Sequence, residues 1–200
     1  MKRLFDIVAS AAGVALLAPA LLVIALLVRW DSPGPALFRH LRVGRNGELF
    51  HMLKFRTMRD DPAGNDGGVT FRPEERVTRL GSFLRQHKLD ELPQLINVLR
   101  GEMSLVGPRP EVPAYVALYP ARDRAVVLSV RPGITDLASI RFRDEASWLA
   151  READPERTYI EKILPRKLRL NRHYVRRQSS CFDAVLIVRT ISVLVRGRRA

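Results

Sequence analysis

An uncharged apolar run near the start of the chain constrains its fold more than any other feature. The run extends from Ile7 to Val28 and reads IVASAAGVALLAPALLVIALLV. As a helix it is long enough to cross the ~30 Å hydrocarbon core of a bilayer. The chain is therefore expected to contact a membrane.

The flanks of the run and its proline indicate how it meets the membrane. Lys2 and Arg3 precede the run and Arg29 follows it, so both flanks are basic. A single span would place one basic flank on the far side, against the positive-inside tendency. Pro19, near the middle, removes a main-chain hydrogen bond and kinks a helix. These features favour a bent, re-entrant membrane helix over residues 1–30 that returns to the cytoplasmic face.

Two alternatives stay open for this segment. A straight single span is compatible with the sequence, because proline is tolerated in membrane helices. A cleaved signal peptide would account for the basic start and for Ala18-Pro19-Ala20. That triplet, however, interrupts the apolar run instead of ending it.

Residues 31–200 are expected to form one compact, membrane-associated cytoplasmic domain. Asn-Gly within residues 44–47 separates two short apolar-rich runs, 36–43 and 48–55, and this pattern predicts a β-hairpin. Residues 60–68 have the composition of a loop. Most of the remaining chain is helical in character, so the predicted fold class is α+β and mostly helical.

Charge narrows the class of partner. The net charge of +13 and the pI near 11.0 favour an anionic partner: nucleic acid, acidic lipid or a phosphorylated substrate. Residues 162–177 carry a basic cluster that would attract anionic lipid, and residues 182–195 are apolar but too short to span a membrane comfortably. The latter segment is expected to lie in the interface or to cover the core. Cys181 is the only cysteine, which excludes an internal disulfide.

An adjacent acid pair, Asp90-Glu91, is the strongest candidate for chemistry. Pro93 follows it, and proline is tolerated in the first turn of a helix, so a helix is expected to start within a residue or two of the pair. The unpaired N–H groups at a helix N-terminus favour carboxylates, phosphate and a metal that bridges the two. The plainer interpretation is that Asp90 caps the helix and Glu91 complements its dipole.

A carboxylate that attacks phosphorus needs positive charge on the phosphate oxygens and usually a divalent cation. Magnesium fits best, because it takes oxygen ligands from one or two carboxylates plus substrate phosphate; Asp90 or Glu91 would supply the protein ligand. No phosphate-binding loop, dinucleotide fingerprint or H-E-x-x-H zinc motif is present. The candidate phosphate-binding residues are basic and come from several motifs: Lys54, Arg56, Arg85, Arg109 and Arg131.

These motifs, taken together, resemble the bacterial sugar transferases, and specifically the small monotopic phosphoglycosyl transferases. The resemblance covers nearly the whole chain. It runs through Lys2-Arg3-Leu4-Phe5-Asp6, the Pro-broken membrane segment, Lys54-Phe55-Arg56-Thr57-Met58, Arg85, Leu89-Asp90-Glu91-Leu92-Pro93-Gln94, Ser104-Leu105-Val106-Gly107-Pro108-Arg109-Pro110 and Arg131-Pro132-Gly133-Ile134-Thr135.

The resemblance implies a two-step transfer of sugar-1-phosphate from a UDP-sugar to undecaprenyl phosphate, as the first step of surface glycan or exopolysaccharide synthesis. Asp90 would attack the β-phosphorus, release UMP and carry the phosphosugar. Glu91 would hold Mg²⁺ or assist proton and charge handling, while Arg85 and Arg109 bind phosphate oxygens. The implied location is the cytoplasmic face of the bacterial inner membrane, on an anionic bilayer. The sequence does not decide between a monomer and a homodimer, nor does it name the sugar.

One departure and one competing function remain. Many relatives follow the Pro-Gly-Ile-Thr turn with glycine and an aromatic residue, whereas this chain has Asp136-Leu137-Ala138-Ser139-Ile140. The competing function is a basic membrane adaptor that binds anionic lipid or nucleic acid without catalysis. The chain lacks a nucleic-acid-binding motif and interleaved aromatic residues, so no nucleic-acid partner is expected.

Overall fold

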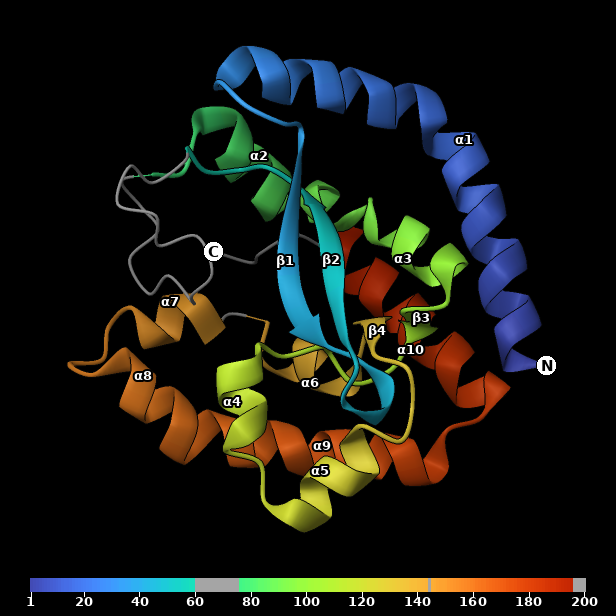
Figure 1. Ribbon diagram of the computed structural model, residues 1–200, viewed down its shortest axis with the longest axis vertical. Coiled ribbons are helices and arrows are strands. Elements are labelled where there is room, and N and C mark those ends of the chain that lie inside the picture. Colours follow the sequence, from blue (N-terminus) through green and yellow to red (C-terminus); the bar gives the residue numbers. More distant parts are fainter. Residues whose placement is uncertain (60–75, 144, 196–200) are drawn as a thin grey trace. The chain divides into compact units, whose positions relative to one another are not determined.

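The first helix follows from the apolar run. In the computed structural model, which describes residues 1–59, 76–143 and 145–195, helix α1 extends over Lys2–Asp31 and contains Pro19. Figure 1 shows that α1 bends midway along its length. A proline inside a helix removes one hydrogen bond and crowds the preceding turn, which accounts for the bend. The re-entrant topology itself stays a prediction.

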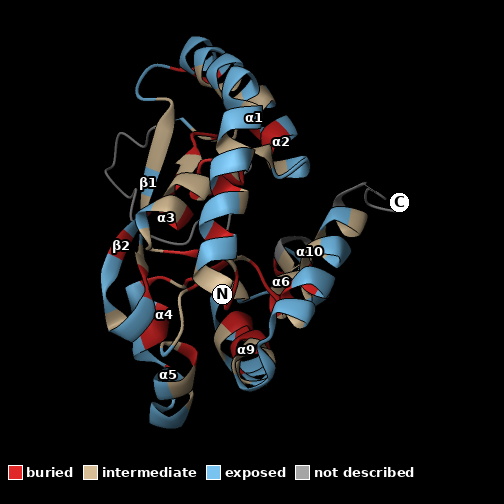
Figure 2. Cartoon of the chain, turned by 90° about the vertical axis from the view of Figure 1, so that its right-hand side faces the viewer, coloured by how far each residue is buried: buried red, intermediate tan, exposed pale blue. Residues whose placement is uncertain are grey.

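The burial pattern of α1 is the reverse of that in a core helix. Within the part of the chain that the structure describes, α1 is the one helix long and apolar enough to cross a membrane, and only 6 % of the residues in its most apolar stretch are buried. Asp6 and Ser10 are buried, whereas Leu16 is 81 % exposed. Figure 2 shows exposed surface along most of α1. Apolar residues that face outward in this way are typical of a membrane-contacting helix.

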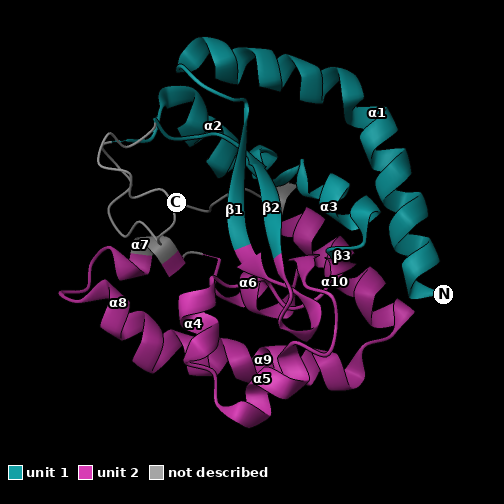
Figure 3. Ribbon diagram, viewed as in Figure 1, with its two compact units in different colours: residues 1–41, 50–103 teal, residues 42–49, 104–200 magenta. Residues whose placement is uncertain are grey.

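The chain divides into two compact units (Figure 3). Unit 1 comprises residues 1–41 and 50–103, and unit 2 comprises residues 42–49 and 104–200. The membrane helix α1 therefore belongs to the same compact unit as the acid pair. The functional boundary predicted at residue 30 stays a prediction.

The predicted hairpin is present. Strands β1 (Leu37–Val43) and β2 (Leu49–Phe55) pair in a two-stranded sheet. A short 3-10 turn, η1 (Arg45–Gly47), joins them, with φ angles of 57° at Asn46 and 85° at Gly47. Asparagine and glycine adopt such left-handed conformations at low cost, which is why the Asn-Gly pair predicts the turn.

Residues 76–100 do not form one continuous helix. Lys88 adopts a left-handed conformation with φ 58°, which ends one helix and starts a separate turn. Residues 60–68, predicted as a loop, lie outside the described residues. The elements of this stretch are α2 (Arg79–Gln86), the 3-10 turn η2 (Leu89–Glu91) and α3 (Gln94–Arg100).

Apolar contacts join these elements to the membrane helix within unit 1. Val28 of α1, Phe55 of β2 and Leu84 of α2 are all less than 5 % exposed and form one cluster. Helix α3 also packs along α1, and Leu95 lies so near α1 that a Cβ atom on Gly13 would be 3.3 Å from it. The acid pair therefore lies among elements that are tied to the membrane helix.

Unit 2 is built around a small parallel sheet. Strand β3 (Ser104–Val106) pairs with β4 (Gly133–Thr135), with Ser104 opposite Gly133 and Val106 opposite Thr135. The described chain thus combines two small sheets with many helices, which confirms the α+β, mostly helical class. The other elements of unit 2 are α4 (Pro113–Ala117), α5 (Ala121–Val127), α6 (Leu137–Arg141), α7 (Glu145–Leu149), α8 (Pro155–Thr158), the π-helical turn η3 (Tyr159–Ile163), α9 (Leu164–Arg177) and α10 (Ser180–Val195).

The basic cluster and the last apolar run form α9 and α10. Tyr174 of α9 is 1 % exposed, and its hydroxyl lies 3.0 Å from the Val106 carbonyl oxygen and 2.7 Å from Asp183 Oδ1. These contacts hold both helices against β3. Helix α10 buries Leu186 but leaves Val188 66 % exposed. The interfacial position of this helix stays a prediction.

Candidate active site

The acid pair lies in a turn of its own between α2 and α3. Asp90 and Glu91 end η2, and both side chains are buried. The left-handed Lys88 directs the chain into this turn, and its carbonyl oxygen accepts the N–H of Glu91 at 3.3 Å. Pro93 then precedes α3. The expected helix therefore starts after Pro93, and the acid pair lies one turn ahead of it.

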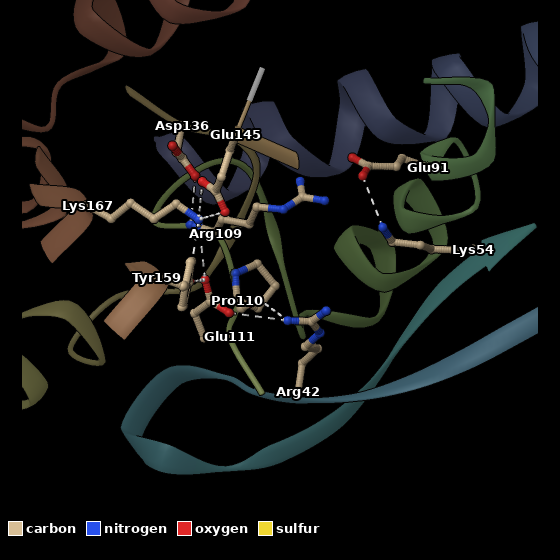
Figure 4. Close-up of polar contacts among 10 residues, drawn as sticks. All are labelled: Arg42, Lys54, Glu91, Arg109, Pro110, Glu111, Asp136, Glu145, Tyr159 and Lys167. Carbon is tan, nitrogen blue, oxygen red and sulfur yellow. Dashed lines mark hydrogen bonds and ion pairs between the residues drawn. The ribbon is translucent and has the colours of Figure 1, made fainter. Parts of the chain in front are cut away.

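Glu91 is paired with a lysine from the hairpin. Lys54 Nζ of β2 lies 3.0 Å from Glu91 Oε1 (Figure 4). The two side chains are only 19 % and 11 % exposed, so solvent and salt screen the attraction weakly. The sequence assigned Lys54 and Glu91 to different roles, and the structure places them in direct contact.

Asp90 has one carboxylate oxygen that accepts no hydrogen bond from the described residues. Its Oδ1 atom is buried and has no hydrogen-bond partner among the described residues, which is rare for buried polar atoms. Burial raises the pKa of Asp90 above 3.8; Lys54 is the strongest opposing charge, and Glu91 adds to the rise. A carboxylate in this state has a lone pair available for a metal ion or for attack on phosphorus.

Arg85 is fixed by its contact with the chain beyond β2. Its Nε donates to Thr57 Oγ1 at 2.8 Å. Burial lowers the pKa of Arg85, and the negative charge of Asp90 opposes that shift. Thr57 is itself held to the start of α2, because its carbonyl oxygen accepts the Thr78 N–H at 3.1 Å. A Cβ atom on Gly81 would come within 2.1 Å of that same oxygen, so glycine permits the close approach.

Asn97 supports the site in a way that the sequence did not reveal. It is fully buried, its Nδ2 donates to the His51 carbonyl oxygen at 2.8 Å, and its Oδ1 accepts the Leu53 N–H at 2.9 Å. These bonds hold α3 against β2, the strand that carries Lys54. A polar residue within the apolar stripe of residues 92–99 is the signal that could have identified it.

Arg56 contacts the end of helix α1. Its Nη2 atom donates to the carbonyl oxygens of Ser32 at 2.6 Å and Val28 at 3.4 Å, and the residue is 6 % exposed. These carbonyls lie at the end of α1, where unsatisfied oxygens accept such bonds. The described contacts of Arg56 therefore connect the end of β2 to α1, and its phosphate-binding role stays a prediction.

In unit 2, the Gly107-Pro108-Arg109-Pro110 turn is bound to the Pro132-Gly133 turn. The Gly107 N–H donates to the Thr135 carbonyl oxygen at 3.1 Å, and the Gly133 N–H donates to that of Pro108 at 3.0 Å. A Cβ atom on Gly133 would lie 2.0 Å from the Gly107 nitrogen. The two turns are therefore in contact through their main chains, which explains the glycine at each position.

The two arginines of these turns differ in what holds them. The Arg109 main-chain N–H donates to Oδ2 of the buried Asp136 at 2.9 Å. Arg131 is half-buried, and its carbonyl oxygen would lie 2.5 Å from a Cβ atom on Gly107. Both arginines belong to unit 2, whereas Lys54, Arg85 and the acid pair belong to unit 1.

A charged network follows the arginine turn directly (Figure 4). Glu111 accepts the Tyr159 hydroxyl at 2.6 Å and pairs with Arg42 at 3.5 Å. Lys167 lies 2.8 Å from Glu145 and 3.8 Å from Glu111. Burial and the charge of Glu111 raise the pKa of Tyr159, so the phenol stays protonated. This network holds Glu111 against η3 and α9, and Lys167 links α9 to α7.

The donor set of the acid pair limits the metals that it fits. No group of three or more His, Cys, Asp or Glu side chains suited to a metal ion occurs among the described residues. Two carboxylates, one with an unpartnered buried oxygen, fit Mg²⁺, which commonly takes one or two carboxylates and completes its shell with water and substrate phosphate. They do not fit a closed zinc site, which needs four protein ligands.

Comparison with known proteins places these features in a wider group. Residues 1–197 match the family model for bacterial sugar transferases. The UDP-glucose:undecaprenyl-phosphate glucose-1-phosphate transferase of Caulobacter vibrioides is 51 % identical over 142 residues, which cover 70 % of this chain and 53 % of that protein. The undecaprenyl-phosphate glucose phosphotransferase of Komagataeibacter xylinus is 41 % identical across 100 % of this chain but 36 % of its own length.

A shorter relative is matched over most of its length. The exopolysaccharide production protein ExoY of Sinorhizobium fredii is 35 % identical over 212 residues, which cover 98 % of this chain and 86 % of that protein. The chain thus spans about half of the Caulobacter vibrioides relative (53 %) and about a third of the Komagataeibacter xylinus relative (36 %). It spans most of the shorter relative from Sinorhizobium fredii.

Proposed function

Because the chain belongs to the bacterial sugar transferase family, we propose that it transfers a sugar-1-phosphate from a UDP-sugar to undecaprenyl phosphate. The reaction would release UMP and begin the synthesis of a surface glycan or exopolysaccharide. The observation that carries this proposal is the buried acid pair, in which Asp90 has an unpartnered oxygen and faces several cationic side chains. The printed names of the relatives support the donor and the acceptor classes.

The proposed chemistry has two displacements at one phosphorus atom. In the first, an Asp90 oxygen bonds to the β-phosphorus of the UDP-sugar while the bond to the bridging oxygen breaks and UMP leaves. In the second, a phosphate oxygen of undecaprenyl phosphate bonds to the same phosphorus and the Asp90 carboxylate leaves. The products are undecaprenyl diphosphate sugar and the original carboxylate, so atoms and charges balance.

Each nearby side chain would have a distinct task. Lys54 holds Glu91 and reduces the repulsion between two adjacent carboxylates and the incoming diphosphate. Arg85, fixed by Thr57, would bind a phosphate oxygen. Arg109 and Arg131 of unit 2 stay predicted phosphate ligands. Asp90 and Glu91 would hold Mg²⁺, which when bound neutralises charge on the donor diphosphate.

A lipid acceptor would account for the exposed apolar helix α1. Undecaprenyl phosphate stays in the bilayer, so the acid pair must work at the level of the head groups. The exposed apolar surface of α1 and its packing in unit 1 support membrane association. We propose a monotopic enzyme on the cytoplasmic face of the inner membrane. Thiol labelling in a Cys181→Ser background tests the topology: Phe5→Cys and Trp30→Cys should both label from the cytoplasm, and labelling from opposite sides would establish a straight span.

The activity is tested with purified full-length chain, Mg²⁺, undecaprenyl phosphate and a panel of UDP-sugars, with UMP release as the readout. One sugar should support release, and mass spectrometry should detect a phosphosugar adduct on Asp90 when the acceptor is omitted. Asp90→Asn should lose both signals, whereas Asp154→Asn, an exposed carboxylate that caps α8, should retain them. Full activity in Asp90→Asn would refute the nucleophile assignment.

A further inference from the structure

A buried carboxylate follows the small parallel sheet of unit 2. Asp136 is 1 % exposed and lies immediately after β4. Its Oδ2 accepts the Arg109 N–H at 2.9 Å and the Ser139 hydroxyl at 3.0 Å, and its Oδ1 accepts the Ser139 N–H. Asp136 therefore contacts both the arginine turn and the start of α6.

Helix capping alone does not explain this residue. A cap needs one oxygen atom, and serine, threonine or asparagine supplies it without burying a charge. Burial raises the pKa of Asp136, while its bonds with Ser139 and the charge of Arg109 oppose the shift. The second oxygen contacts the main chain of Arg109, which lies far from α6 in the sequence. A serine or threonine cap, which has one side-chain oxygen, would lack the bond to Arg109.

One hydrogen bond, from the main-chain N–H of Arg109 to Asp136, restrains the arginine turn. Arg109 lies between Pro108 and Pro110, which have no N–H groups, so its own amide is the sole main-chain donor within residues 108–110. The prolines fix their φ angles, and the bond with Asp136 fixes the residue between them. Figure 4 shows the Arg109 side chain extending away from the Asp136 carboxylate. The main chain is held on one side and the guanidinium is directed to the other.

We propose that Asp136 is a positioning residue for Arg109: its carboxylate fixes the main chain of the arginine turn so that the guanidinium is presented to a substrate phosphate. The presentation to phosphate rests on the function proposed above. The bond between Asp136 and Arg109 does not, and it can be measured without any substrate.

The bond is tested by NMR on the full chain in detergent micelles with ¹⁵N-labelled arginine. The Arg109 amide signal is identified by its loss in Arg109→Lys. In Asp136→Ser, whose hydroxyl retains a cap for α6 but leaves no second oxygen atom for Arg109, it should move upfield and exchange with solvent at least tenfold faster, whereas Ser139→Ala should change it little. If Asp136→Ser does not fold, Asp136→Thr retains the same cap and should show the same change. An unaltered Arg109 amide in a folded variant would overturn the proposal.

Kinetics test the positioning role. Asp136→Ser should lower kcat/KM for the UDP-sugar about tenfold, and in an Arg109→Ala background it should cause no further loss, because a residue that acts through another is not additive with it. Equal losses in both backgrounds would show a purely structural role and refute positioning. If wild type releases no UMP from any UDP-sugar, the proposed function fails, and the NMR result still decides whether Asp136 holds Arg109.

Discussion

Replacing Gly133 with alanine should force apart the two turns that carry Arg109 and Arg131. A Cβ atom at position 133 would lie 2.0 Å from the Gly107 nitrogen and 2.5 Å from its oxygen. Ordinary contacts begin near 3.4 Å, so the main chains must separate by about 1.4 Å, the difference between 3.4 and 2.0 Å. No flexible side chain is present to move instead, because the atoms in contact are main-chain atoms.

The cost follows from the bonds that this separation breaks. Gly107 N–H to Thr135 O, at 3.1 Å, and Gly133 N–H to Pro108 O, at 3.0 Å, would both be lost. Each bond contributes about 1 kcal/mol to stability, and crowding adds about 1–3 kcal/mol, which gives about 3–5 kcal/mol in total. At about 2–4 °C per kcal/mol for a chain of this size, the midpoint of thermal unfolding should fall by at least about 6 °C.

The assay is thermal unfolding of the full chain in detergent, followed by circular dichroism. Gly47→Ala is the matched control, because Gly47 has φ +85° and nothing within 4 Å of its Cβ position. Its cost is conformational alone, about 1 kcal/mol, so its midpoint should fall by only about 2–4 °C. Gly133 has no positive φ. A Gly133→Ala midpoint that is unchanged, or lowered no more than that of Gly47→Ala, would refute the close approach of the two turns.

Four further predictions concern unit 1. Because burial raises the pKa of Asp90 above 3.8, kcat/KM should fall on acidification at a pH above 3.8. Lys54 lowers that pKa, so Lys54→Met should move the acidic fall in kcat/KM to higher pH. A pH–rate profile that the substitution leaves unchanged would contradict this. With a raised folded-state pKa, the contribution of Asp90 to stability is complete below pH 3.8 and is lost as the pH rises through that pKa. Asp90→Asn should therefore unfold at a higher temperature than wild type at pH 8, and a lower midpoint would count against the burial of an unpartnered charge. Asn97→Ala should destabilise the chain by about 1–3 kcal/mol, since it leaves the buried Leu53 N–H without that partner and removes the bond to the His51 carbonyl oxygen, and an unchanged midpoint would argue against this bridge between α3 and β2. EDTA should abolish UMP release and added Mg²⁺ should restore it; activity that survives chelation would exclude the metal assignment.

Features that depend on neighbouring residues were predictable from the sequence. Asn46-Gly47 specifies its own turn because both residues accept positive φ, and the hairpin is present as predicted. Pro19 specifies a bend in α1 wherever that helix lies. The acid pair precedes a helix as Pro93 indicated, although the left-handed Lys88 places it in a separate 3-10 turn. Nothing in the residue type of Lys88 predicts this conformation, because lysine rarely adopts positive φ.

Features that depend on distant residues were not predictable in the same way. Arg56 looked equivalent to Lys54 in the same motif, because residues two apart in a strand point to the same face. Strand β2 ends at Phe55, however, so the face on which Lys54 lies does not fix the direction of Arg56. In the structure, Lys54 forms an ion pair with Glu91, whereas Arg56 donates a hydrogen bond to a carbonyl oxygen at the end of α1. In the sequence, Asp136 is notable only because it replaces the glycine that many relatives have at this position. Its contact with Arg109 depends on the pairing of β3 with β4, which brings the two residues together.

The packing of α1 against α3 has a practical consequence for handling this protein without lipid. Arg3 Nη1 donates to the Val98 carbonyl oxygen at 2.7 Å, and Gly13 lies close to Leu95. Cutting away residues 1–30 would remove one wall of unit 1 and uncover the helix that follows the acid pair. Such a fragment should aggregate or lose the geometry of the turn. Helix α1 is therefore better kept and solubilised with the rest of unit 1 than removed.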